Sequence, residues 1–152
     1  MNKLILFFLL LMLVPMGCDE QEEVVDAQSQ VYDFLHEMNP DLHSTLSKMK
    51  KEIANADEKI QRLYDLKDRH PNQRKMVNKS LKQWQGLRKK LNFTLNKIYD
   101  KVERAYVAYK IDEIQGKDKF SAISKALLED ANTVLANAEI TKSLIEEELY
   151  GK

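Results

Sequence analysis

The sequence predicts an all-α fold, an elongated antiparallel bundle of three to four helices with coiled-coil-like packing. Composition is the first reason, because four glycines, three prolines and 32% charged residues in 152 are typical of long helices. The second reason is an apolar seam through residues 73–113 that recurs in steps of three and four. A helix of that length spans roughly 60 Å, which is longer than a small globular core is wide. The seam comprises Val77, Leu81, Trp84, Leu91, Leu95, Ile98, Val102, Ala105 and Tyr109.

The start of the chain has the pattern of an export leader. Lys3 supplies a positive charge, and residues 4–14 are eleven consecutive apolar residues. This run is too short to cross a hydrocarbon core comfortably, since a spanning helix needs about 20 residues. We therefore interpret the run as a targeting signal rather than as part of the fold.

The end of this leader resembles that of bacterial lipoproteins, in which cleavage falls before a cysteine that is then acylated. Gly17 and Cys18 carry the resemblance, whereas Pro15 and Met16 depart from the usual pattern. The resemblance implies a signal peptide in residues 1–17 and a palmitate-type lipid anchor on Cys18. An ordinary secretory leader that releases a soluble protein, and an uncleaved short anchor, are the alternatives.

The residues after Cys18 bear on location. In lipoproteins of Gram-negative bacteria, an aspartate in the position of Asp19 resembles a signal for retention in the inner membrane. The resemblance implies attachment to the periplasmic face of the inner membrane, with the outer membrane as the alternative. Residues 18–23 are predicted to be an acidic tether, which an anionic lipid surface would repel.

Chain breakers divide the remainder into helices. Asn39 before Pro40 suits the cap and first turn of a new helix. The turn at residues 70–72 contains a proline and reverses the chain, and residues 115–118 are predicted as a second reversal with Gly116 at a helix C-terminus. The expected helices are about 24–38, 40–69, 73–114 and 120–149, in one bundle domain of residues 24–152.

Charge is distributed unevenly although the net charge is zero. Residues 19–47 hold eight acids and no Lys or Arg, whereas residues 69–99 hold nine Lys or Arg and no acid. In an antiparallel bundle this basic stretch lies far from the N-terminus.

One interpretation of this basic stretch is an internally balanced surface, with the acids at 146–148 opposite the lysines. The other is a basic tip that docks an acidic partner. The partner-binding candidates are Arg62, Lys67, Arg69, His70, Arg74, Lys75 and Lys79, with Tyr106 and Tyr109 as half-exposed aromatic candidates.

The sequence contains few candidates for catalytic residues or metal ligands. His36 and His43 are seven residues apart, roughly 10 Å along a helix axis, which is too far to share a metal ion unless the kink between them is severe. No histidine adjoins a nucleophile motif, and the only thiol is Cys18. We therefore predict no catalytic residue, no metal site and no cofactor.

The expected function follows from the predicted location and shape of the protein. We expect a lipid-anchored extracytoplasmic helical protein that acts without catalysis as an interaction, scaffold or accessory component of a cell-envelope complex, with an envelope protein as partner. The alternative is a binding module for an anionic envelope ligand, such as lipopolysaccharide, phospholipid or cell-wall polymer. No nucleic-acid partner is expected, because the leader exports the chain and the basic stretch lacks interleaved aromatic residues.

Overall fold

The computed structural model describes the chain from residue 19 to residue 150, and side chains from residue 28 to residue 149. The predicted leader and Cys18 lie outside the described residues. Within residues 19–150 the chain is helical throughout, with no strand. The elements are α2 (Asp19–Met38), α3 (Pro40–Arg69), the short 3-10 helix η1 (Pro71–Gln73), α4 (Arg74–Ile111) and α5 (Glu113–Tyr150).

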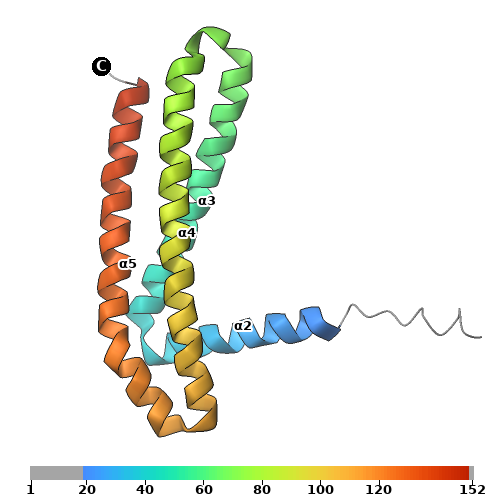
Figure 1. Ribbon diagram of the computed structural model, residues 1–152, viewed down its shortest axis with the longest axis vertical. Coiled ribbons are helices and arrows are strands. Elements are labelled where there is room, and N and C mark those ends of the chain that lie inside the picture. Colours follow the sequence, from blue (N-terminus) through green and yellow to red (C-terminus); the bar gives the residue numbers. More distant parts are fainter. Residues whose placement is uncertain (1–18, 151–152) are drawn as a thin grey trace, which may run out of the picture.

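The long helices α3, α4 and α5 run antiparallel in sequence order and form an elongated bundle (Figure 1). Helix α2 leaves this bundle sideways, near the end where α4 meets α5 (Figure 1). The predicted all-α antiparallel bundle is confirmed. Its three long helices form the rod, and α2 joins the rod through its C-terminal half.

The predicted seam is the core of the rod. Its residues on α4 are buried, except that Tyr109 is half-buried. After Trp84 the seam shifts by one residue, so that Leu87 is buried and Arg88 points outward to form an ion pair with Asp57 on α3. Buried apolar residues on the two neighbouring long helices also recur in steps of three, four or seven. They are Leu42, Leu46, Met49, Ala56 and Leu63 on α3, and Phe120, Leu127, Ala131, Ala138 and Ile145 on α5.

The junction between α2 and α3 contains both predicted start signals. The Asn39 Oδ1 atom accepts a hydrogen bond from the Leu42 backbone N–H at 2.9 Å, and Pro40 occupies the first position of α3. The start of α2 differs from the prediction, because residues 19–23 belong to the helix rather than to a separate tether. Acidic residues in a first helical turn are favoured by the helix dipole, and no glycine or proline interrupts α2.

The reversal between α4 and α5 corrects a second prediction. The turn lies at Asp112 rather than at residues 115–118. The Asp112 N–H donates to the Ala108 carbonyl, and the Asp112 Oδ1 atom accepts from the Gln115 N–H at 3.0 Å, so one residue ends α4 and caps α5. Gly116 is buried inside α5 and does not end a helix.

Candidate functional site

The distal tip is the end of the rod at the α3–α4 turn, and we define it by Lys67, Arg69, His70, Arg74 and Lys75. Two backbone hydrogen bonds form the turn, from the His70 N–H to the Leu66 carbonyl and from the Gln73 N–H to the His70 carbonyl. The tip projects beyond the end of α5 (Figure 1). It therefore presents its side chains to solvent at the end opposite α2.

Two predicted partner-binding residues near the tip are engaged within the protein. Arg62 forms an ion pair with Glu58 one turn earlier on α3. The Lys79 Nζ atom lies 2.9 Å from the Glu148 Oε2 atom on α5. Hydrogen bonds from Lys79 and then Gln83 lower the pKa of Glu148 below its ordinary value. The expected opposition between the acids of α5 and the basic stretch is thus found at Lys79.

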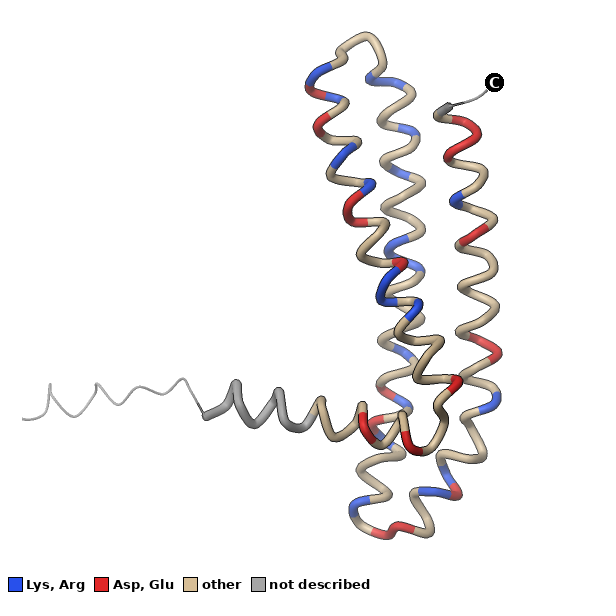
Figure 2. Tube along the Cα trace, turned by 180° about the vertical axis from the view of Figure 1, so that it is seen from behind, with Lys and Arg blue, Asp and Glu red and all other residues tan. Residues whose placement is uncertain are grey.

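The five residues of the distal tip form no ion pair with any other described residue. Lys67 is half-buried and the other four are exposed. Two acids that sequence reasoning overlooked, Asp65 and Asp68, are exposed on the last turns of α3 and offset part of this charge. In Figure 2 basic and acidic positions alternate on this part of α3, whereas α4 opposite carries only basic ones. The tip is net positive but not uniformly so.

A distal cleft of about 220 Å³ lies below the tip between α3 and α5. Leu63 and Leu66 of α3 and Leu149 of α5 line it, together with Trp84 of α4. Sequence periodicity placed Trp84 in the core, and the side chain is only 1% exposed. Lys59, Arg62 and Glu146 also line the cleft, which is therefore an open depression with apolar and charged walls over a packed interior.

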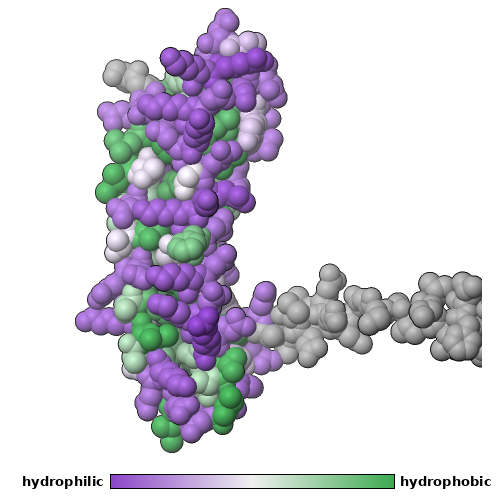
Figure 3. Space-filling view, in the orientation of Figure 1, coloured by the Kyte–Doolittle hydropathy of each residue, from purple (hydrophilic) through white to green (hydrophobic). Residues whose placement is uncertain are grey.

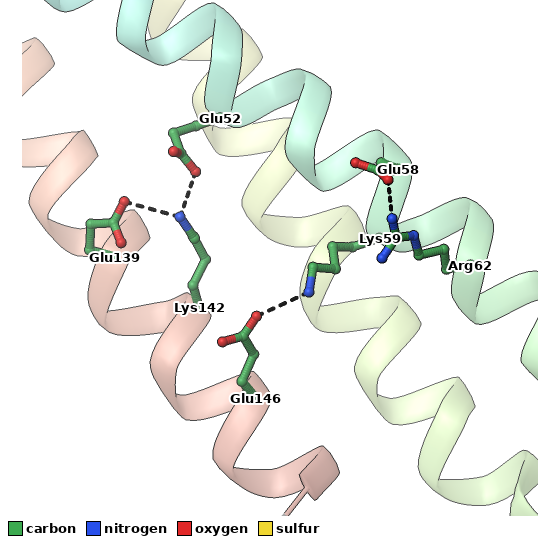
Figure 4. A network of polar contacts seen from close by, with 7 residues as sticks. All are labelled: Glu52, Glu58, Lys59, Arg62, Glu139, Lys142 and Glu146. Atoms are coloured by element: carbon green, nitrogen blue, oxygen red, sulfur yellow. Dashed lines mark hydrogen bonds and ion pairs between the residues drawn. The ribbon is translucent and has the colours of Figure 1, made fainter.

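Polar contacts join α3 to α5 beside this cleft (Figure 4). The Lys142 Nζ atom lies 2.8 Å from Glu52 on α3 and 3.1 Å from Glu139 on α5. Further along, Lys59 contacts Glu146 at 3.2 Å. Burial lowers the pKa of Lys142, but hydrogen bonds to Glu52 and Glu139 outweigh this effect and leave the pKa above its ordinary value. Lys142 therefore remains a cation that links the two helices.

The elbow cluster lies at the bend between α2 and α3, and it comprises Tyr32, His36, His43, Lys50 and Tyr99. The rings of His36 and His43 are 4.8 Å apart between centroids. The sequence predicted that these histidines are too far apart to share a metal ion unless the kink between them is severe. The chain does bend sharply between α2 and α3, at Asn39 and Pro40, and this bend brings the two rings together. Tyr32 packs edge-on against His43 at 4.2 Å, and the Lys50 ammonium lies over the rings of Tyr32 and Tyr99.

Two polar atoms of the elbow cluster, the His43 Nε2 atom and the Tyr99 hydroxyl, are buried and have no hydrogen-bond partner in the part of the chain that the structure describes. Burial, then the neighbouring His36 and Lys50, lowers the pKa of His43 below its ordinary value of 6.5. Among the described residues, no group of three or more His, Cys, Asp or Glu side chains could hold a metal ion. The arrangement is thus a pair of imidazoles packed against aromatic rings.

The two predicted aromatic candidates pack inside the protein, against α2. Phe34 of α2 lies 5.4 Å from Tyr106, 5.1 Å from Tyr109 and 5.3 Å from Phe120 between ring centroids. The Tyr106 hydroxyl donates a hydrogen bond to the Gln30 Oε1 atom at 2.6 Å. In the described residues these two tyrosines thus contact α2 of the same chain. Sequence analysis did not single out Phe34, although it lies three residues after Val31 and four before Met38, the spacing of one helix face.

Within residues 19–150, none of the helices combines the length and the apolar character that crossing a bilayer requires. The chain matches no protein-family model, no curated protein and no solved structure.

Proposed function

We propose that this protein is a lipid-anchored helical rod of the bacterial cell envelope, which acts without catalysis as an interaction, scaffold or accessory component of an envelope complex. The leader that ends at Cys18 supports attachment to a membrane, and Asp19 supports the periplasmic face of the inner membrane. The outer membrane is the alternative location. The partner is an envelope protein that contacts the distal tip.

The observation that carries this proposal is the separation of the two ends of the rod. Helix α2, which follows Cys18 in the chain, joins the rod near the α4–α5 turn, whereas the distal tip lies at the other end of α4 (Figure 1). The 38 residues of α4 span about 57 Å. Anchoring at one end therefore presents the other end well away from the bilayer.

The unpaired charge of the distal tip supports a second candidate function. Arg69, Arg74 and Lys75 are exposed and lack ion pairs among the described residues. Arginine donates paired hydrogen bonds to carboxylate and phosphate groups. A lipopolysaccharide, phospholipid or cell-wall polymer with such groups fits this surface, so the tip can also serve as an anionic-ligand module.

Charge reversal at the tip tests both candidates. The variant Arg69→Glu, Arg74→Glu, Lys75→Glu is expected to lose partners in pull-downs from detergent-solubilised membranes. A matched control reverses Lys89, Lys90 and Lys101, which are exposed on the middle of α4 and outside ion pairs with described residues. Equal recovery of partners with the two variants would remove the tip from the proposal.

Crosslinking in intact cells tests where the partner contacts the rod. A photoreactive residue at position 70 is expected to form adducts, whereas one at position 93 is not. Phe93 is 71% exposed on the middle of α4, so access to solvent is comparable and only position differs. Adducts of the same mass from both positions would contradict a tip-directed contact.

Salt dependence tests whether the distal tip is the contact surface. Binding through its exposed charges, whether to an anionic ligand or to an acidic protein, is expected to fall steeply from low to moderate ionic strength. Recovery that changes little with salt would indicate apolar docking elsewhere on the rod and would contradict a tip-directed contact. The measurement is recovery of the bound species across a salt series with the full chain in detergent.

A further inference from the structure

Three branched aliphatic side chains are exposed at the α4–α5 turn, and we name them the basal apolar tip. Ile111 is 83% exposed, Ile114 is 76% exposed and Val107 is 53% exposed. Val107 and Ile111 lie one helical turn apart on α4, and Ile114 lies in the first turn of α5. Apolar residues also cluster at this end of the molecular surface (Figure 3). Scattered exposed apolar residues are ordinary, but a cluster at one end indicates a contact surface.

The basal apolar tip is joined structurally to the N-terminal helix. Phe34 of α2 packs on Tyr106 and Tyr109, which lie in the last turns of α4 just before Ile111. The sixteen residues from Asp19 to Phe34 are helical and span about 22 Å. Cys18 is bonded to Asp19, so a lipid on Cys18 keeps this end of the rod within a short reach of a bilayer.

The charges around the basal apolar tip are nearly balanced. Lys110, Lys117 and Lys119 are accompanied by Asp112, Glu113 and Asp118. Lys117 and Glu113 form an ion pair at 2.6 Å. A surface with little net charge does not attract an anionic partner strongly, so any contact here is driven by the aliphatic side chains. Lysines beside an apolar surface extend their charged ends toward the lipid headgroups.

We propose that the α4–α5 turn inserts the basal apolar tip into the interface of the bilayer that holds the lipid on Cys18. This inference rests on the lipid attachment in the proposed function. The rod is then held at two points, the acylated cysteine and the turn, and it stands away from the membrane with its distal tip outward. The turn alone binds lipid weakly, and the tether supplies the high local concentration that makes the contact persist.

Lipid fits this surface better than a second copy of the chain. Three aliphatic side chains at a convex end cover far less than the ~800 Å² per partner that a stable protein interface buries. A tethered turn needs no such area, because the anchor already restricts it to the membrane surface. The bilayer is therefore the occupant to which the geometry points.

The test places an environment-sensitive dye at two matched isoleucines of α5 in the full chain. Ile114→Cys places the dye at the basal apolar tip, and Ile140→Cys places it at mid-rod, where the native side chain is 60% exposed. Each membrane-purified protein is reconstituted into phosphatidylethanolamine–phosphatidylglycerol vesicles that contain lipid brominated near the top of the acyl chains. The unsubstituted chain, treated in the same way, reports whether the Cys18 thiol is blocked.

The dye at position 114 is expected to show blue-shifted emission and to lose most of its intensity to the brominated lipid, with little change between low and moderate salt. The dye at position 140 is expected to be unaffected. A dye at position 111 repeats the measurement in case the first label disturbs the turn.

Each other outcome has a distinct meaning. A water-exposed dye at 114 on a chain with a blocked Cys18 overturns this inference and leaves the lipid anchor intact. A blue shift at 114 without bromine quenching also overturns it and indicates a protein contact. Quenching at both positions overturns the upright orientation. A chain that stays in the soluble fraction and takes dye on Cys18 overturns both this inference and the proposed anchor.

Discussion

Gly116 on α5 lies directly against the backbone of Tyr109 on α4. A Cβ atom added at position 116 would come closer than 3.0 Å to the Cα, N and Cβ atoms of Tyr109. The absence of a side chain therefore lets the two helices approach closely just beyond the turn at Asp112. The same contact keeps Tyr109 in position against Phe34, so the docking of α2 depends on it as well.

Substitution Gly116→Ala is expected to destabilise the protein. The added methyl group meets backbone atoms, which cannot move aside as the end of a flexible side chain can, so α4 and α5 must separate locally. Overpacking of this kind lowers the free energy of unfolding by about 1–3 kcal/mol. Urea unfolding followed by circular dichroism measures the effect.

Gly86→Ala is the matched control. Gly86 lies away from the ends of α4, on its solvent-exposed face, and a Cβ atom added there would have no neighbour within 4 Å. Alanine in a helix interior raises the free energy of unfolding by roughly 0.5–1 kcal/mol relative to glycine. Destabilisation by both alanines would show that packing at Gly116 is not the cause.

Phe34→Ala is expected to release α2 from the rod without unfolding the rod. The substitution removes a buried ring that touches Tyr106, Tyr109 and Phe120, at a cost of about 3 kcal/mol. Hydrogen-exchange protection in residues 28–38 should fall by roughly 100-fold, because 1.4 kcal/mol corresponds to a factor of ten. Protection in α4 should persist. Phe93→Ala, which truncates an exposed ring, should leave both regions unchanged.

Stability is expected to decline in mild acid because of His43. Its pKa in the folded state lies below 6.5, through burial first and then through His36 on α2 and Lys50 on α3. The unfolded chain therefore binds the proton more readily than the folded chain. The contribution of His43 is fully present above pH 6.5 and is lost as the pH falls through the folded-state pKa.

The measurement is the free energy of unfolding from about pH 7.5 to about pH 5, the range in which histidine titrates. Substitution His43→Gln should make this pH dependence shallower, whatever its effect on absolute stability. An identical slope in the unsubstituted protein and in His43→Gln would rule out His43 as the titrating group.

Lys142→Ala is expected to weaken the contact between α3 and α5. The Lys142 and Glu52 side chains are each only 19% exposed, so their ion pair is partly shielded from solvent. Its loss should lower the free energy of unfolding by about 1 kcal/mol, near the upper end for exposed pairs. Lys125→Ala on the exposed face of α5 should change stability by less than about 0.5 kcal/mol.

A double-mutant cycle with Glu52→Gln isolates the interaction itself. If the two single changes act through one ion pair, their effects should not add, because either change already removes the pair. Additive effects would instead mean that Lys142 acts through its contact with Glu139 or through its packing. The urea series used for the single variants provides the measurement.

Periodicity predicted the parts of the fold that repeat. The three- and four-residue spacing identified the buried seam of α4, and Asn39 with Pro40 marked the start of α3. Helical sequence alone did not reveal the direction of the bend at that junction. The bend brings His36 against His43, and it depends on where Phe34 finds aromatic partners on α4 and α5. Such long-range contacts leave little trace in local spacing.

The α4–α5 turn shows how a strong local signal can mislead. Glycine commonly follows a helix C-terminus, so Gly116 seemed to mark the reversal. The competing signal was Asp112 followed three residues later by Gln115, the pattern of a helix start. Gly116 instead allows α5 to pack closely against the backbone of Tyr109 on α4, and this contact can be recognised only in the folded structure.

At the distal tip, counting basic residues located the positive charge but overlooked the acids Asp65 and Asp68.

Helix α4 runs without interruption from Arg74 beside the distal tip to Ile111 at the basal turn. A continuous helix packed along its length resists stretching and bending, so whatever binds one end stays a fixed distance from whatever binds the other. The length of the rod would therefore set the distance between a partner at the distal tip and one at the basal turn. Inserting or deleting whole heptads in all three long helices would change that distance.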